Sequence, residues 1–179
     1  MVVYDDSQVQ SDIDNLNNRS VIGSENVYFG AKLSAPQTTT TIGENIKFDT
    51  IVKNSSNSEI TLNNGVFKLK GGVKWNVRCG VRILGTGVLS YQIYNLTEQS
   101  FESTSSQVIS VTNTTNANQS AIIDEILEPN IDCLYEIRIV YSTNVTSIDS
   151  NMTNLRIFEI GRTAILDPIE YAQDHDIKY

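Results

Sequence analysis

The chain has 179 residues, of which 40% are hydrophobic and 19% are charged, and its formal net charge is −8. This length fits one domain with short appendages and is enough to bury a sizeable core. The acidic balance argues against a nucleic-acid partner, which would require a basic face, and no apolar run approaches the roughly 20 residues that cross a bilayer, so we expect no membrane insertion.

The first segment, residues 1–26, is rich in Asp, Asn, Ser and Gln. Its apolar residues Val9, Ile13 and Leu16 are spaced by four and then three positions, which is the seam spacing of a coiled coil. Because so short a helix is marginal alone in water, the segment is either a frayed arm or the end of a stalk held together by oligomerisation. It has neither the basic region nor the apolar centre of a signal peptide, so we expect no export by that route.

Short strands replace the helical spacing after residue 26. Period-two or apolar runs separated by polar turns predict strands at 27–33, 46–52, 59–62, 67–69, 73–83, 88–94, 108–111, 120–126, 134–141 and 155–160. About ten short strands with almost no helical periodicity indicate an all-β sandwich or jelly roll. We expect this head domain to span residues 27–161, between the N-terminal segment 1–26 and an acidic C-terminal arm, 162–179.

The strongest alternation lies between residues 63 and 83. Every odd position from Val73 to Ile83 is apolar, and Phe67 and Leu69 alternate with lysines just upstream. Gly71-Gly72 separates the two runs, which predicts a hairpin because glycine tolerates the positive φ of tight turns. The side chains expected to anchor the core are Phe48, Phe67, Trp75 and Tyr135.

Two of the expected strands, 121–126 and 155–160, are apolar on both faces. In the second, Leu155 and Ile157 point one way while Phe158 and Ile160 point the other. A strand that is buried on one side by its own core and apolar on the other needs a second partner, and the simplest is another copy of the chain. The predicted subunit interface comprises Ile122, Phe158 and Ile160, together with the seam residues Val9, Ile13 and Leu16.

Both cysteines, Cys79 and Cys133, fall within alternating strands on the side that faces the core. We expect two buried, reduced thiols, with a disulfide as the alternative if their strands are neighbours. Core or interface packing is also favoured over sugar stacking for the strand tyrosines Tyr91, Tyr94, Tyr135 and Tyr141.

Residues for catalysis are scarce. The single histidine, His175, lies in the acidic arm, which is a poor place to hold it beside a nucleophile. Asp174 and Asp176 flank it, but clustered polar residues in a tail are usually solvated. We therefore expect no catalytic residue, no metal and no cofactor, and a protein that is not an enzyme. The arm itself is expected to lie on the surface or on a neighbouring subunit.

The stretches FGAKLSA, IKFDTIV, NNGVFKLKGGVKWNV, VLSYQIYN, LYEIRIVY and LRIFEIG follow one another in this order. The order resembles the tumour necrosis factor and complement globular-head jelly rolls. Complement-type heads have an Asn-Gly-x-Phe-like strand, a glycine and then alternating aromatics. Here Trp75 is that aromatic, while Lys74, Asn76 and Arg78 stand where the family often has more of them. The resemblance implies a ten-stranded jelly roll that assembles as a homotrimer.

Heads of this family commonly sit on a stalk. Without a collagen-like repeat or an export signal, the chain looks like a bacteriophage fibre or capsid protein. We expect a trimeric virion structural protein, made in the host cytoplasm and displayed on the virion exterior as a head fibre or receptor-binding tip. Residues 1–26 would attach it to a capsid or fibre-base protein, and its loops would contact a host-surface glycan or protein through avidity. Two alternatives stay open: a capsid decoration protein without a ligand, and a carbohydrate-binding module or glycan-active enzyme on a β-sandwich.

Overall fold

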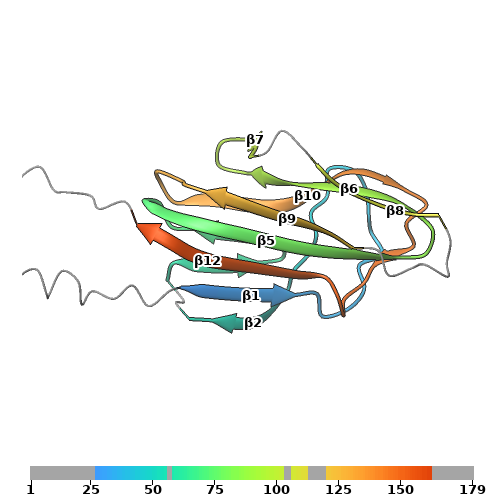
Figure 1. Ribbon diagram of the computed structural model, residues 1–179, viewed down its shortest axis with the longest axis horizontal. Coiled ribbons are helices and arrows are strands. Elements are labelled where there is room, and N and C mark those ends of the chain that lie inside the picture. Colours follow the sequence, from blue (N-terminus) through green and yellow to red (C-terminus); the bar gives the residue numbers. More distant parts are fainter. Residues whose placement is uncertain (1–26, 56–57, 103–105, 113–119, 163–179) are drawn as a thin grey trace, which may run out of the picture.

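The computed structural model describes residues 27–55, 58–102, 106–112 and 120–162. Within these ranges every regular element is a β-strand, and twelve strands form two six-stranded sheets (Figure 1). Ten strands have four or more residues and two have only two, so the expected all-β, ten-stranded jelly-roll sandwich is confirmed. The seam residues Val9, Ile13 and Leu16, His175 and the arm beyond Arg162 lie outside the described residues.

The first sheet, called sheet I, has the longest strand at its centre. Its order is β11-β5-β12-β1-β2, with β9 on the other side of β5, and all its pairs are antiparallel. The bounds are β1 (Tyr28–Lys32), β2 (Thr50–Asn54), β5 (Val73–Leu84), β9 (Ser120–Leu127), β11 (Ser147–Ile148) and β12 (Asn154–Arg162).

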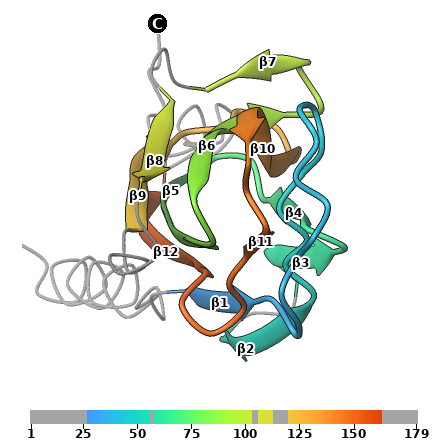
Figure 2. The ribbon, with the colours of Figure 1, turned by 90° about the vertical axis from the view of Figure 1, so that its right-hand side faces the viewer.

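The second sheet, sheet II, covers the inner face of sheet I. Its order is β3-β4-β10-β6-β7, with β8 also paired to β6. Figure 2 shows the two layers end-on. The bounds are β3 (Ile60–Asn63), β4 (Val66–Leu69), β6 (Gly87–Asn95), β7 (Ser100–Phe101), β8 (Gln107–Val111) and β10 (Cys133–Thr143).

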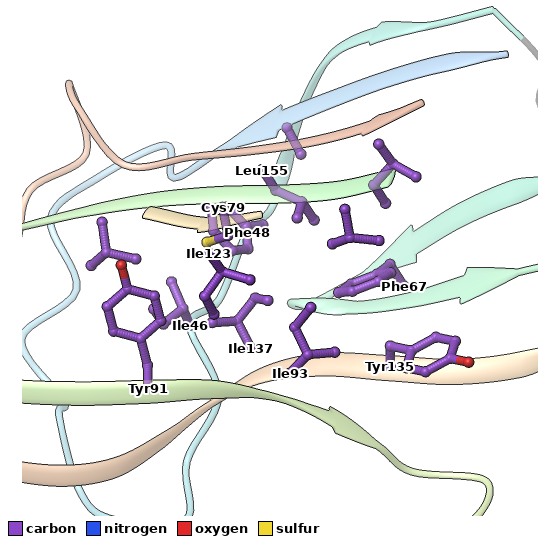
Figure 3. Packing of buried hydrophobic residues seen from close by; sticks show 14 of the residues in the cluster. Ile46, Phe48, Phe67, Cys79, Tyr91, Ile93, Ile123, Tyr135, Ile137 and Leu155 are labelled. Carbon is purple, nitrogen blue, oxygen red and sulfur yellow. The ribbon is translucent and has the colours of Figure 1, made fainter. Parts of the chain in front are cut away.

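The core is built from the inward side chains of both sheets (Figure 3). Every second residue of β5 from Val73 to Ile83 is buried, as a strand with one covered face requires. Phe48, Phe67 and Trp75 are fully buried and Tyr135 is 2% exposed, so the four expected anchors all lie in this core. The rings of Phe67 and Tyr135 stack with their centroids 5.8 Å apart.

The hairpin predicted at Gly71-Gly72 is wrong. β4 pairs with β3 and β10 in sheet II, whereas β5 belongs to sheet I, so these glycines lie in a crossover between the sheets. Alternation reports which face of a strand is buried, but it does not report the neighbouring strand. The hairpin lies one turn earlier: Asn64 (φ 48°) and Gly65 (φ 82°) join β3 to β4, and two positive φ values fit a two-residue type I′ turn.

The strand expected at 46–52 is also displaced. The structure places β2 at Thr50–Asn54, and the residues before it run beside β10 instead. The Ile46 backbone N–H donates to the Ile137 carbonyl at 2.8 Å, and the Gly43 N–H donates to Ile139 at the same distance. This pairing turns Ile46 and Phe48 into the core (Figure 3), which explains the apolar alternation of the stretch.

Both ends of the described chain lie at one end of the sandwich. Tyr28 at the start of β1 is the register partner of Phe158 near the end of β12, and the Glu159 N–H donates to the Val27 carbonyl at 2.9 Å. We call this the proximal end (Figure 1, left). The opposite, distal end carries the β5–β6 turn, the β10–β11 and β11–β12 connections and the loop at 38–43; it faces the viewer in Figure 2.

Candidate functional site

The outer face of sheet I, turned away from sheet II, is the candidate functional surface. Ile122 and Ile126 of β9 are 46% and 54% exposed there, while Ile123 and Leu127 of the same strand are buried in the core. On β12, Ile160 is 48% exposed and Phe158 is half-buried, while Leu155 and Ile157 are fully buried. β9 and β12 therefore carry apolar side chains on two faces, only one of which the described chain covers.

Strand register brings these apolar residues into rows across the outer face. Ile126, Asn76, Phe158 and Tyr28 are successive partners across β9, β5, β12 and β1. The rings of Tyr28 and Phe158 are in contact, with centroids 4.9 Å apart. Ile122 lies in a parallel row nearer the distal end, opposite Gly80. Antiparallel pairing thus gathers residues from distant parts of the sequence onto one surface.

Charged residues form a row between the two apolar ones. Asp124, Arg78, Arg156, Gly30 and Lys53 are successive partners from β9 to β2. Asp124 accepts a hydrogen bond from the Asn76 amide at 2.7 Å and lies 3.8 Å from the Arg78 guanidinium. Arg156 has no ion-pair partner within the described ranges.

Arg78 and Arg156 stand directly opposite each other on neighbouring strands. Like charges in this position repel and destabilise an isolated sheet. In a chain with a net charge of −8, two adjacent arginines with only Asp124 as a neighbouring carboxylate in their row are unexpected. A partner surface that brings carboxylates to the pair would remove the repulsion, so the face suits an apolar and acidic counterpart.

Metal-ligating side chains do not gather in the described part of the chain. That part contains no cluster of three or more His, Cys, Asp or Glu side chains able to hold a metal ion. Cys79 and Cys133 are both buried and free, as expected, and burial raises the pKa of the Cys79 thiol far above its usual value. A thiol in that state is a poor nucleophile. No helix in the same ranges is long and apolar enough to cross a membrane.

Three of the six predicted interface residues lie on the outer face of sheet I. Ile122, Phe158 and Ile160 all point away from the core of sheet I, whereas the three seam residues lie outside the described ranges. The residues predicted from the sequence do not include Ile126, Tyr28 or the Arg78–Arg156 pair. Ile126 could have been found, since it follows Ile122 by four positions and shares its face. The arginine pair could not, because its strands are 78 positions apart and only the register joins them.

Comparison with known proteins supports the fold alone. No protein-family model and no curated protein matches the chain. Among solved structures, murine APRIL at pH 5.0 superimposes with a TM-score of 0.60 at 8% identity, covering 76% of this chain and 100% of that one. The globular domain of zebrafish complement 1qA gives 0.53 at 11% identity, covering 76% and 98%. The chain therefore has the jelly-roll fold shared by the tumour necrosis factor-like and complement heads.

Proposed function

We propose that the chain is a homotrimeric structural and adhesive head, in which the outer face of sheet I is buried between subunits. The observation that carries this proposal is the pair of strands that are apolar on two faces, with Ile122, Ile126 and Ile160 each about half exposed. Domains of the tumour necrosis factor and complement-head fold typically form trimers, which supports the same assembly. Burying the face between copies would remove its apolar residues from water.

The arrangement of the chain ends suits a head on a stalk. Residues 1–26 and 163–179 join the described domain at its proximal end, since β1 begins and β12 ends there. A closed ring of three copies would direct these segments to one side and the distal loops to the other. Three equal sites on one rigid head bind a repetitive surface through avidity even when each site is weak.

We place this head on the exterior of a virus particle, as a head fibre or receptor-binding tip attached through residues 1–26. The support for this placement is the layout of the sequence, in which a short segment rich in Asn and Ser, residues 1–26, precedes the β-rich head. The alternative of a capsid decoration protein shares the trimer but lacks the ligand, so cell binding separates the two.

The trimer is tested by sedimentation equilibrium of the full chain at micromolar concentration. We expect a mass of about 60 kDa, three times the 19.9 kDa of one chain. Ile122→Asp should give monomers, because it places a charge in the buried interface. Leu134→Asp is the matched control: Leu134 is 44% exposed, close to the 46% of Ile122, but it lies on sheet II. A wild-type monomer would contradict the proposal, as would an Ile122→Asp trimer.

Adhesion is tested by the binding of labelled head to a panel of bacterial cells. The wild-type trimer should bind at least one strain, and monomeric Ile122→Asp should bind that strain more weakly by on the order of a hundredfold. A trimer that binds virus capsids and no cell would favour decoration over adhesion.

A further inference from the structure

The net negative charge of the chain lies almost entirely in its two end segments. Residues 27–162 contain 12 Asp or Glu and 11 Lys or Arg, so their net charge is −1. Residues 1–26 carry a net charge of −4, and residues 163–179, which we call the C-terminal segment, carry −3. The head is therefore nearly neutral as a whole, and the end segments hold the carboxylates that exceed its own cations.

Three cations on the outer face of sheet I have no ion-pair partner within the described ranges: Arg156 of β12, Lys32 of β1 and Lys53 of β2. Register places Arg156 and Lys53 in one row with Arg78. Asp124 is the one carboxylate in that row, and it already accepts a hydrogen bond from an amide at 2.7 Å. The other carboxylates in described ion pairs are bound to cations outside the row: Glu59, Glu128, Asp132, Glu136 and Asp149.

The C-terminal segment begins at the proximal edge of this face, because β12 ends at Arg162. Its apolar side chains come early and its carboxylates continue further along, in the order Ile165, Leu166, Asp167, Ile169, Glu170, Asp174 and Asp176. On the face, Ile160 and Phe158 lie nearest the end of β12, and Arg156 lies beyond them toward the distal end. A segment laid on the face from its proximal edge would bring apolar side chains to the apolar row and carboxylates to the arginines.

The sequence after Arg162 favours contact with a neighbouring subunit over contact with the same subunit. To cover its own β12 the chain would have to reverse directly after Arg162, but the first turn signal there is Asp167-Pro168. The residues before that signal would carry the chain away from its own sheet. The 11 residues after Pro168 span about 36 Å when extended, whereas Arg156 lies about 20 Å from the end of β12, so the segment is long enough to reach the arginines of a subunit beside it.

We infer that the C-terminal segment of each subunit docks on the outer face of sheet I of the next subunit and brings carboxylates to Arg78 and Arg156. These ion pairs relieve the repulsion between the two arginines, and the apolar side chains of the segment pack against Phe158 and Ile160. The inference rests on the proposed function, because the trimer sets one subunit beside the face of the next. It adds a segment beyond β12 to the interface and makes assembly depend on charge.

The test neutralises the segment in the full chain, as Asp167→Asn/Glu170→Gln/Asp174→Asn/Asp176→Asn. All of these changes lie outside the head, so its core is untouched. Sedimentation equilibrium measures the concentration at which half of the trimer dissociates. We expect this concentration to rise by on the order of tenfold, since each exposed ion pair contributes modestly. Raising the salt concentration should weaken the wild-type trimer and have less effect on the variant.

Asp5→Asn/Asp6→Asn/Asp12→Asn/Asp14→Asn is the matched control, because it removes the same number of carboxylates from residues 1–26. It should not weaken the trimer, since like charges gathered at one end of an assembly repel each other. Arg156→Gln should weaken the wild-type trimer but have little further effect in the chain with the neutralised C-terminal segment. The two changes remove the same contact, so their effects should not add.

Hydrogen exchange at residues 163–179 shows which subunit the segment contacts. Exchange should be slower in the wild-type trimer than in Ile122→Asp monomers. Equally slow exchange in those monomers would mean that the segment lies on its own head, and would overturn the inference. A trimer that is not weakened by neutralising the C-terminal segment, or that the control weakens as much, would also overturn it and leave the proposed function standing. A wild-type monomer would overturn both.

Discussion

Trp75 lies in the core between the crossover that precedes β5 and strand β9, which is distant in the sequence. Its indole is fully buried near the proximal end of β5, opposite Leu127 of β9. Its Nε1–H donates to the Lys70 carbonyl at 3.0 Å, which ties the crossover between the sheets to the strand that follows it. A large ring with one satisfied polar atom is the usual state of a buried tryptophan.

Trp75→Ala should lower the free energy of unfolding by about 3–5 kcal/mol, because it removes the largest fully buried side chain and leaves a cavity. Urea denaturation followed by circular dichroism measures the change. Phe101→Ala, which truncates an exposed aromatic, should have a much smaller effect. An unchanged midpoint for Trp75→Ala would mean that the ring does not anchor the core.

The face to which a side chain points could be predicted from the sequence where alternation holds. It could not be predicted where a bulge breaks the alternation. The inward Trp75 and the outward Ile122 and Phe158 all follow from a period of two. Tyr141 does not, because one extra residue in β10 reverses the side to which every later side chain points. The bulge leaves no mark in the run LYEIRIVY, so the exposure of Tyr141 could be found only in the structure.

At the scale of elements, the crossover at Gly71 shows why a pair of glycines between two strands does not always form a hairpin turn. A Cβ built on Gly71 would lie 2.5 Å from the backbone of Ile131, so the loops at 70–72 and 128–132 pack against each other without room for a side chain. The Gly71 N–H donates to the Asp132 carboxylate, and the Gly72 N–H donates to the Pro129 carbonyl at 2.8 Å. Close approach of two backbones accounts for glycine here, and no hairpin is needed.

Gly71→Ala should therefore lower the free energy of unfolding by about 1–3 kcal/mol, because the crossover must move away from Ile131. Gly80→Ala is the matched control, since a Cβ on Gly80 meets only the Asn154 side chain, at 3.7 Å. Gly80 lies within β5, its φ is outside the left-handed region, and its added Cβ would meet only ordinary van der Waals contacts. Thermal denaturation of both variants measures the difference, and equal midpoints would show that the crossover has room to adjust.

Strand positions were easier to predict from the sequence than strand partners. The long strands β5, β6, β10 and β12 fall close to where their apolar patterns begin and end. The partners of β4 and β5 do not follow from their patterns, since either sheet would bury the same faces. Residues 46–48 show the same limit: they are apolar because they enter the core beside β10, without belonging to β2.

At the scale of the whole molecule, charge is unevenly distributed. The chain carries a net charge of −8, yet the middle row of the outer face of sheet I holds Arg78, Arg156 and Lys53 against the single carboxylate of Asp124. Lys53 lies over the ring of Tyr28, 5.4 Å from its centroid. A neighbouring copy is a ready source of carboxylates for this row, because the rest of an acidic chain supplies them.

Assembly through this face makes a prediction about heat stability. If the folded head is stabilised by association, its melting temperature must rise with protein concentration by mass action, by roughly 2–4 °C for each tenfold increase in a trimer of chains this size. Scanning calorimetry over a hundredfold concentration range measures the rise. Ile122→Asp should melt at one temperature throughout that range, while Leu134→Asp should keep the wild-type slope, because only the first changes the buried face. A wild-type melting temperature that does not move with concentration would mean that the exposed isoleucines of β9 and β12 stay in water and that each head stands alone.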